Sequence, residues 1–179
     1  MTIRTSQFDS ESAIAHAEQW CVNLATPFFL TENKSGTHAA DVRELLSLIP
    51  SLSGTVWEAL IWLRVGLITR AHDLVQDAGT GIEAYIHGMI HRLEGDYWNA
   101  KYWFRNAGRN TIRQVTEQMN VHEPTGTFDP SLIVDRLEQF SRTAPPTNSP
   151  KENSRNSEKQ ALAKILEQEW WAVWHTCRP

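Results

Sequence analysis

The sequence has few of the features that mark redox, secreted or membrane proteins. Only two of its 179 residues are cysteines, and neither belongs to a CxxC motif, so we favour free thiols at Cys21 and Cys177 over a disulfide between them. The N-terminal residues contain no apolar segment of the kind found in secretory signals. The longest apolar-rich run, residues 56–68, is interrupted by Glu58 and Arg64 and is too short to span a bilayer. These absences favour a cytoplasmic protein without membrane contact.

The sequence also lacks the charge and the motifs of several large function classes. Its net charge of -4 argues against a nucleic-acid-binding surface, which needs an excess of Lys and Arg. It contains no glycine-rich phosphate loop, no GxSxG nucleophile elbow and no Cys–His nucleophile arrangement. Kinases, nucleotide-dependent dehydrogenases and serine hydrolases of the usual folds are therefore not expected.

Strand signals are nearly absent, whereas apolar residues recur at helical spacing along most of the chain. We therefore predict an all-α protein, with a short helix at 111–120 among others. Four apolar stripes are expected to be buried. In a first helix, which Pro27 ends, the stripe is Ile14, Ala17, Cys21 and Leu24, and in a second helix it is Val42, Leu45, Leu46 and Ile49. A helix after a loop at 122–130 carries Leu132, Ile133, Leu137 and Phe140, and the last helix carries Leu162, Ile165, Leu166, Trp170 and Val173.

The composition changes along the chain in a way that suggests three segments. Residues 1–142 are predicted to form one helical domain, 143–157 a flexible linker rich in Pro, Ser and Asn, and 158–179 a Trp-rich helix. The stripe of that helix is too apolar to remain in water, so we expect it to pack back on the domain or on a partner, including a second copy in a homodimer. Most of the tryptophans are expected in the core, although the adjacent Trp170 and Trp171 cannot both face the same side.

The central region, at about 55–108, contains an internal repeat. Residues 84–107 have small and large side chains at the spacings of a TPR unit, which is a pair of antiparallel helices. The residues at these spacings are Gly88, His91, Gly95, Tyr97, Ala100, Phe104 and Ala107, and 29 positions earlier Ala59, Trp62, Gly66, Ala71, Val75 and Ala78 repeat the pattern. TPR units repeat at about 34 residues, so we predict shorter, TPR-like helical hairpins with flanking capping helices.

Two resemblances accompany this repeat. The run Ala-Lys-Tyr-Trp-Phe-Arg-Asn-Ala-Gly at 100–108 is similar to the second helix of a Sel1-type repeat. The longer stretch HGMIHRLEGDYWNAKYWFRNAG resembles a family of uncharacterised bacterial and fungal proteins with an HGxxHRxEGDYxNAKYWFR-type signature. Phe128-Asp129-Pro130 and Trp170-Trp171 also fit that family. The resemblance implies a family relationship and no particular activity.

Histidines and a glutamate of the second repeat copy share one helix face. His87 and His91 are four residues apart and Glu94 is three further on, so all three lie within roughly 60° around the helix axis. Two imidazoles one turn apart can bind a divalent metal such as zinc, with a carboxylate as third ligand. In the first copy, Glu58 matches the position of His87 and His72 begins the second helix. Packing of the hairpins would bring Glu58 and His72 toward the pair, and these four residues are the catalytic candidates.

A purely structural explanation stays open for these residues. Helical His pairs are often only solvated or hydrogen-bonded, Glu94 precedes the turn residue Gly95, and Gly88 follows His87 where the HExxH motif of zinc proteases has Glu. Histidines at core positions would nevertheless destabilise the fold unless they were paired. A second polar set surrounds the same turn and comprises the candidate ligand-binding residues Arg92, Asp96, Asn99, Tyr102 and Arg105. Asp96 either caps the next helix and pairs with one of the arginines, or Arg92 and Arg105 hold an anionic ligand.

Two functions remain in competition. The first is a TPR-like module that binds a protein, a peptide or a small ligand. The second is an enzyme or metal-binding protein with its His/Glu site between the central helices, where Glu58 would act as a ligand or as the base that activates a metal-bound water. The repeat is visible in the sequence and the site is inferred from helical geometry, so the binding module ranks slightly ahead.

Overall fold

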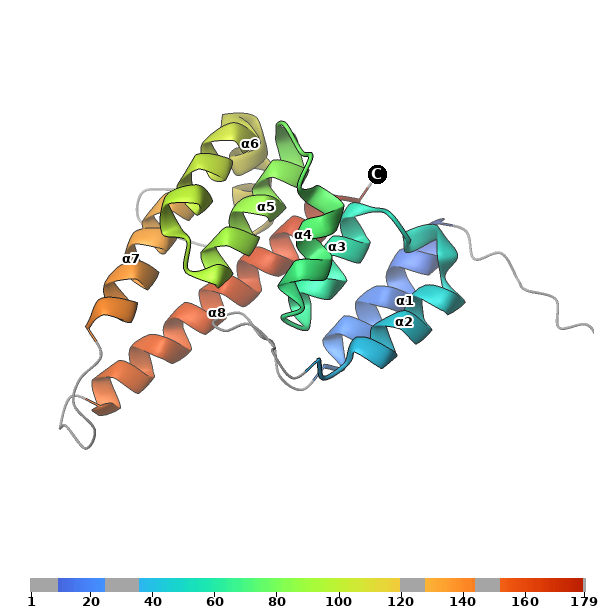
Figure 1. Ribbon diagram of the computed structural model, residues 1–179, viewed down its shortest axis with the longest axis horizontal. Coiled ribbons are helices and arrows are strands. Elements are labelled where there is room, and N and C mark those ends of the chain that lie inside the picture. The colour runs from blue at the N-terminus through green and yellow to red at the C-terminus, as the bar shows by residue number, and fades with distance from the viewer. Residues whose placement is uncertain (1–9, 25–35, 120–127, 144–151, 179) are drawn as a thin grey trace, which may run out of the picture.

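The computed structural model describes residues 10–24, 36–119, 128–143 and 152–178, and every regular element within these ranges is helical (Figure 1). The predicted all-α class is therefore confirmed. In chain order the elements are α1 (Ser10–Val22), α2 (Ala39–Leu48), the 3-10 helix η1 (Pro50–Leu52), α3 (Val56–Arg64), α4 (Ile68–Val75), α5 (Gly81–Glu94), α6 (Tyr97–Gln118), α7 (Pro130–Arg142) and α8 (Glu152–Thr176). No helix in the described part of the chain has the length and apolar character needed to cross a bilayer.

The repeat corresponds to two helical hairpins, α3–α4 and α5–α6. Each first helix ends at a glycine with positive φ, Gly66 at 72° and Gly95 at 82°, a conformation that favours glycine. After Gly95 the chain reverses at once, because the Asp96 carboxylate accepts a hydrogen bond from the Asn99 amide and caps α6. The two turns lie 29 residues apart, as the sequence repeat requires.

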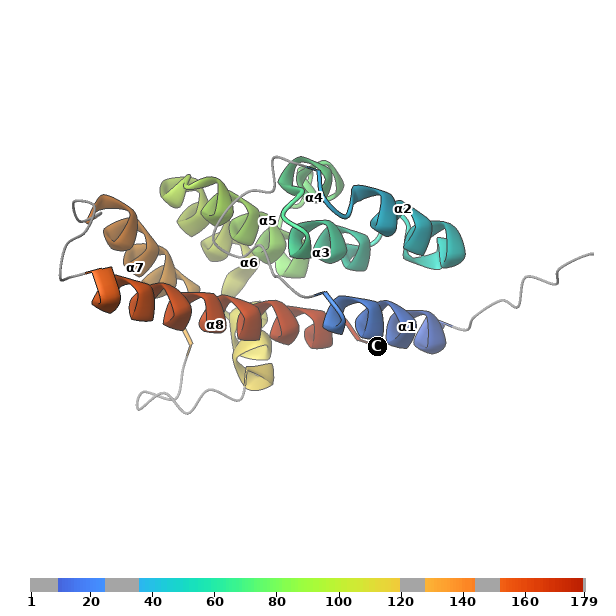
Figure 2. The ribbon, with the colours of Figure 1, turned by 90° about the horizontal axis from the view of Figure 1, so that it is seen from below.

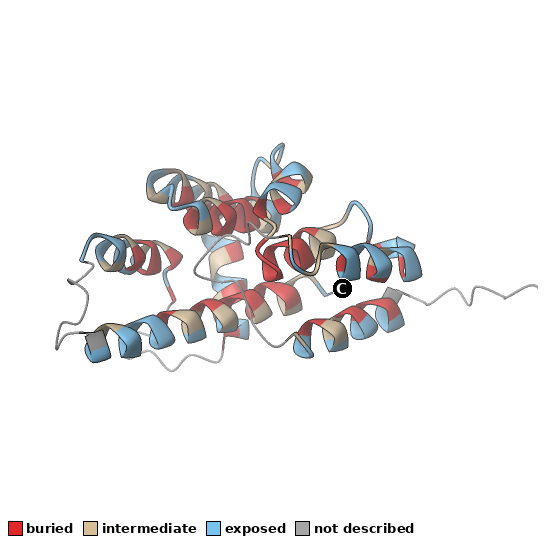
Figure 3. Ribbon diagram, turned by 60° about the horizontal axis from the view of Figure 1, so that its bottom comes forward, coloured by how far each residue is buried: buried red, intermediate tan, exposed pale blue. Residues whose placement is uncertain are grey.

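The hairpins rest on the C-terminal helix. Figure 2 shows α8 and α1 on one side of the molecule and α2–α5 on the other. The C-terminal half of α8 is buried, and its N-terminal half is mostly exposed (Figure 3). Fully buried side chains of α8 meet those of α3, α5 and α6 in one core, whose largest members are Trp170, Trp174, Tyr85, Phe104, Ile49, Leu52, Leu60, Ile61, Ile86, Ile90, Leu162 and Leu166.

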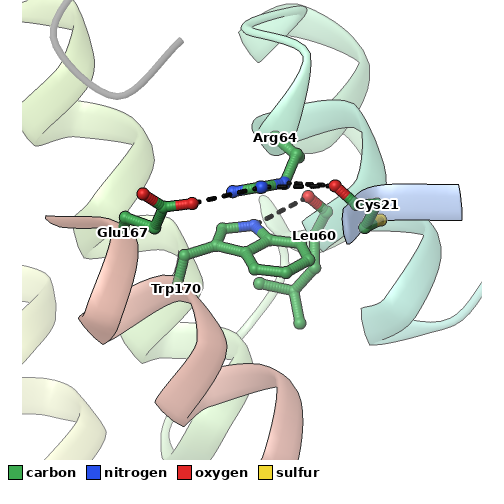
Figure 4. Close-up of polar contacts among 5 residues, drawn as sticks. All are labelled: Cys21, Leu60, Arg64, Glu167 and Trp170. Carbon is green, nitrogen blue, oxygen red and sulfur yellow. Dashed lines mark hydrogen bonds and ion pairs between the residues drawn. The ribbon is translucent and has the colours of Figure 1, made fainter. Parts of the chain in front are cut away.

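A buried arginine joins three segments of this core (Figure 4). The Arg64 guanidinium donates hydrogen bonds to the Cys21 carbonyl at 3.2 and 3.3 Å and to Glu167 Oε1 at 3.3 Å. The guanidinium carbon of Arg64 lies 4.9 Å from the ring centre of Trp170, whose Nε1 donates to the Leu60 carbonyl at 3.0 Å.

Both thiols are free as predicted, and burial raises the pKa of Cys21 and of Cys177 to about 12, so neither is a reactive thiolate near neutral pH.

Some sequence expectations about helix boundaries were wrong. Helix α8 begins at Glu152, within the stretch predicted as a linker, and Arg155 anchors its start by donating to the Phe140 carbonyl at 2.9 Å. By contrast, the helix expected at 111–120 is present, because α6 joins two helices across a break at the non-helical Gly108 and its second part covers most of that range. The rest of the predicted linker at 144–151, Pro27, and most of the loop predicted at 122–130 lie outside the described residues.

One predicted core residue and one tryptophan lie at the surface. Leu132, expected to be buried, is 60% exposed on α7, and Trp98 is 73% exposed on α6. Apolar spacing identifies the helix but does not fix the edges of its buried face, which depend on the neighbouring helices. By contrast, Trp170 is fully buried while the adjacent Trp171 is half-buried, as expected for neighbours on a helix.

Candidate functional site

Three histidines from two helices meet where the hairpins pack together. His87 and His91 lie one turn apart on α5, and His72 reaches them from α4. The two helices are joined by the short connection 76–80, so α4 of the first hairpin packs directly against α5 of the second. The repeat therefore places a side chain of one copy against the histidine pair of the other.

Two nitrogens of this cluster are as close as ligands of one metal ion, and the third is nearby. His72 Nε2 and His87 Nε2 lie 3.0 Å apart, and one potential ligand atom from each of the three residues lies within 4.8 Å of the others. Two nitrogens bound tetrahedrally to one zinc ion are roughly 3.3 Å apart, given Zn–N bonds of about 2.0–2.1 Å. The His72–His87 pair is therefore already at ligand spacing, and His91 lies within reach of the same point.

His87 is held in its neutral form. Its side chain is 3% exposed, and this burial is the main cause that lowers its pKa to about 4. The charges that His72 and His91 would carry lower the pKa further, and a hydrogen bond to the Val75 backbone has a smaller, opposing effect. At pH 7 a neutral imidazole offers a free nitrogen lone pair, which is the form that binds a metal.

Aromatic rings fix the orientation of His87. The Trp103 indole stacks on the imidazole, with the ring centres 4.0 Å apart, and the His91 ring stacks at 4.8 Å. Tyr102 meets Trp103 edge to face and lies parallel to Trp98, so an aromatic row leads from the cluster to the surface. Stacking restricts rotation of the imidazole and reduces the ordering needed to bind a ligand.

Glu94 supports the cluster from outside. Its Oε2 lies 3.0 Å from His91 Nδ1, within ion-pair distance but without the geometry of a hydrogen bond. A carboxylate in this place orients a ligating histidine and makes it more basic, an arrangement common around bound zinc. Glu94 was predicted as a direct metal ligand, whereas its geometry matches a supporting position, and the third nitrogen comes from His72.

Glu58 is engaged within its own helix. Its carboxylate accepts hydrogen bonds from the Gly54 amide at 2.6 Å and from Trp62 Nε1 at 2.9 Å. The group of potential ligands in the described residues consists of the three histidines and does not include Glu58. Position Glu58 matches His87 in the repeat, but these local partners at the start of α3 hold the carboxylate there.

Arg92 is committed to a partner that the sequence analysis did not find. It forms a buried ion pair with Glu169 of α8, with Nη1 donating to Oε1 at 3.1 Å and Nη2 donating to Oε2. Tyr85 also donates to Glu169 Oε1 at 2.8 Å, and burial, followed by the Glu169 charge, raises the pKa of Tyr85 well above its usual value. The available signal was Glu169 itself, a charged residue within the apolar stripe of the last helix.

The remaining ligand-binding candidates are spread over different surfaces. Asp96 caps α6 and also accepts a hydrogen bond from Asn99 Nδ2 at 2.7 Å. Tyr102 is 41% exposed in the aromatic row, and Arg105 is exposed at a cavity beside α7. The five residues therefore do not form a single pocket.

No family model matches the chain, and neither the curated proteins nor the solved structures include a significant match to it. The TPR, Sel1 and signature resemblances thus stay predictions. What the site can do follows from its geometry.

Proposed function

We propose that the protein binds one divalent transition-metal ion, with zinc the best fit, through His72, His87 and His91. The observation that carries this proposal is the gathering of three imidazole nitrogens within 4.8 Å of one another. Imidazole ligands suit zinc, copper, nickel and iron, and zinc accepts three histidines without a strong geometric demand.

The chain supplies what such a site needs beyond its ligands. Burial keeps His87 neutral, Trp103 stacks on its ring, and the Glu94 carboxylate lies beside His91. A zinc ion held by three neutral histidines keeps a fourth position for water and lowers the pKa of that water toward 7. The proposal therefore includes small-ligand binding or hydrolytic chemistry at the ion as its functional class.

The test is zinc stoichiometry and affinity of untagged, chelator-free protein, measured by elemental mass spectrometry and calorimetric titration. We expect about one equivalent of zinc, loss of binding in His72→Ala and His91→Ala, and an affinity about 10–100-fold weaker in Glu94→Gln. His16→Gln is the matched control, because His16 is an exposed histidine on α1 outside the cluster.

Circular dichroism of each variant separates loss of binding from loss of fold. His72 and His91 are only half-buried, so their substitution by Ala should leave the helical signal intact. Absence of zinc uptake by the wild type at pH 7.5, or equal uptake by His72→Ala, would contradict the proposal.

A protein- or peptide-binding module is the second candidate, supported by the exposed pair Trp98 and Tyr102. Their rings are parallel within 8° on the outer face of α6, and exposed aromatic residues are enriched at interfaces. A partner retained by the wild type and lost by a Trp98→Ala, Tyr102→Ala variant would support this function. Equal retention by the two proteins would oppose it.

A further inference from the structure

A cavity of about 270 Å³ lies on the side of α6 that faces the start of α7, and it is separate from the histidine cluster. Ile112 supplies its apolar lining in front of the fully buried Phe104, Arg105 and Arg109 supply its positive charge, and Asp129 and Ser131 form the rim at the start of α7. No function considered so far uses this cavity.

The cavity lies at a break in α6. Gly108, which also lines it, has φ 83° and ψ 158°, values that a residue with a side chain rarely adopts. A Cβ built at Gly108 would have no atom within 4 Å, so this glycine is required for its backbone conformation and not for lack of space. The break separates the turn that carries Phe104 and Arg105 from the turn that carries Ile112.

Charge in the cavity is unbalanced. In the described residues neither Arg105 nor Arg109 forms an ion pair. The rim carboxylate of Asp129 accepts a hydrogen bond from the Ser131 amide at 2.8 Å and caps α7. The lining of the cavity therefore contains two guanidinium groups and one carboxylate, so these lining residues carry one net positive charge.

We propose that this cavity binds a small monocarboxylate with an apolar body, such as an aromatic acid. The planar guanidinium matches a carboxylate with two parallel hydrogen bonds, and the half-buried Ile112 provides the apolar contact. The volume is below the range of about 300–1,000 Å³ that is typical of pockets for drug-sized ligands, so the ligand is smaller. The site is independent of the proposed metal function.

Benzoate is the probe that tests this assignment. In heteronuclear NMR titrations of the full chain we expect saturable shifts confined to residues 104–112 and 129–131. Arg105→Gln and Arg109→Gln should each weaken binding at least about tenfold, which corresponds to loss of a charge-assisted contact. Arg113→Gln is the matched control, because Arg113 lies on the same helix but pairs with Glu117 outside the cavity.

Two comparisons make the result decisive. Benzyl alcohol keeps the aromatic body and lacks the charge, and it should bind at least about tenfold more weakly than benzoate. Inorganic phosphate carries the charge without the apolar body, and tighter binding of phosphate would overturn the monocarboxylate assignment. Dispersed shifts, or unchanged benzoate affinity in both Arg variants with native NMR spectra, would overturn the site itself.

Discussion

At the scale of single residues, His87 shows how burial sets chemistry. Its imidazole is enclosed between Trp103 and His91, so protonation would place a charge against two rings with little water to solvate it. The same enclosure gives the residue a defined pH response.

We predict that the His87 ring protons of the metal-free protein titrate with a midpoint near pH 4 in NMR. The unfolded chain protonates this histidine near pH 6.5 and the folded chain near 4. The stability contribution of His87 is therefore complete above pH 6.5 and is lost as the pH falls toward 4, at up to about 1.4 kcal/mol per pH unit.

The measurement is urea unfolding at several pH values for the wild type and His87→Gln. The variant should show a shallower loss of stability between pH 6.5 and 4, because it has no group to protonate at this position. Parallel curves for the two proteins, or an NMR midpoint near 6.5, would show that His87 is not held neutral by burial.

The histidine cluster was only partly predictable from residue spacing. The i, i+4 spacing placed His87 and His91 on one face, and the repeat indicated that His72 would face them. The spacing could not show that Glu58 is held by Gly54 and Trp62, because that depends on hydrogen bonds at the start of α3. It also could not pair Arg92 with Glu169, which lies 77 positions away.

At the scale of helices, α5 and α6 pack closely because of one small residue. A Cβ added at Gly88 would lie 2.9 Å from two ring atoms of Phe104, whose ring is fully buried against Tyr85. This contact explains why the sequence repeat has small residues at this position, Gly88 in one copy and Ala59 in the other.

Gly88→Ala should lower the free energy of unfolding by about 1–2 kcal/mol. Better helix propensity would stabilise the variant by up to about 1 kcal/mol, but overpacking against a ring that cannot move costs about 1–3 kcal/mol. Thermal unfolding followed by circular dichroism measures the difference. Gly79→Ala is the control, since a Cβ at Gly79 meets no atom within 4 Å, and it should leave stability nearly unchanged.

Helix type was more predictable than helix boundaries. The apolar stripes and the two turn glycines indicated the helices and both hairpins. The start of α8 was misplaced because residues 152–161 are polar and mostly exposed, and only tertiary contacts such as Arg155 with Phe140 reveal that they belong to a helix.

At the scale of the whole molecule, α8 joins the hairpins into one core. Its Glu169 is fully buried and neutralises Arg92 of α5, while Trp170 bonds to the backbone of α3. A buried ion pair of this kind is expensive to break from one side, because the remaining charge loses its partner.

We predict that Glu169→Gln destabilises the protein by about 3–5 kcal/mol in urea unfolding. The double variant Arg92→Met, Glu169→Leu should recover most of this loss, because no uncompensated charge remains. Glu117→Gln breaks the exposed pair with Arg113 and should change stability by less than about 1 kcal/mol. A loss below about 1 kcal/mol for Glu169→Gln would show that the pair does not hold α8 in place.

The position of α8 in the chain has a consequence for biosynthesis. A ribosome makes this helix after α1–α7, yet Glu169, Trp170 and Trp174 complete the core that those helices share. Until α8 emerges, Arg92 and Tyr85 lack their carboxylate and the apolar faces of the hairpins remain in water. The nascent chain therefore presents its hydrophobic surface to chaperones for most of its synthesis, and closure of the core follows translation of residues 162–174.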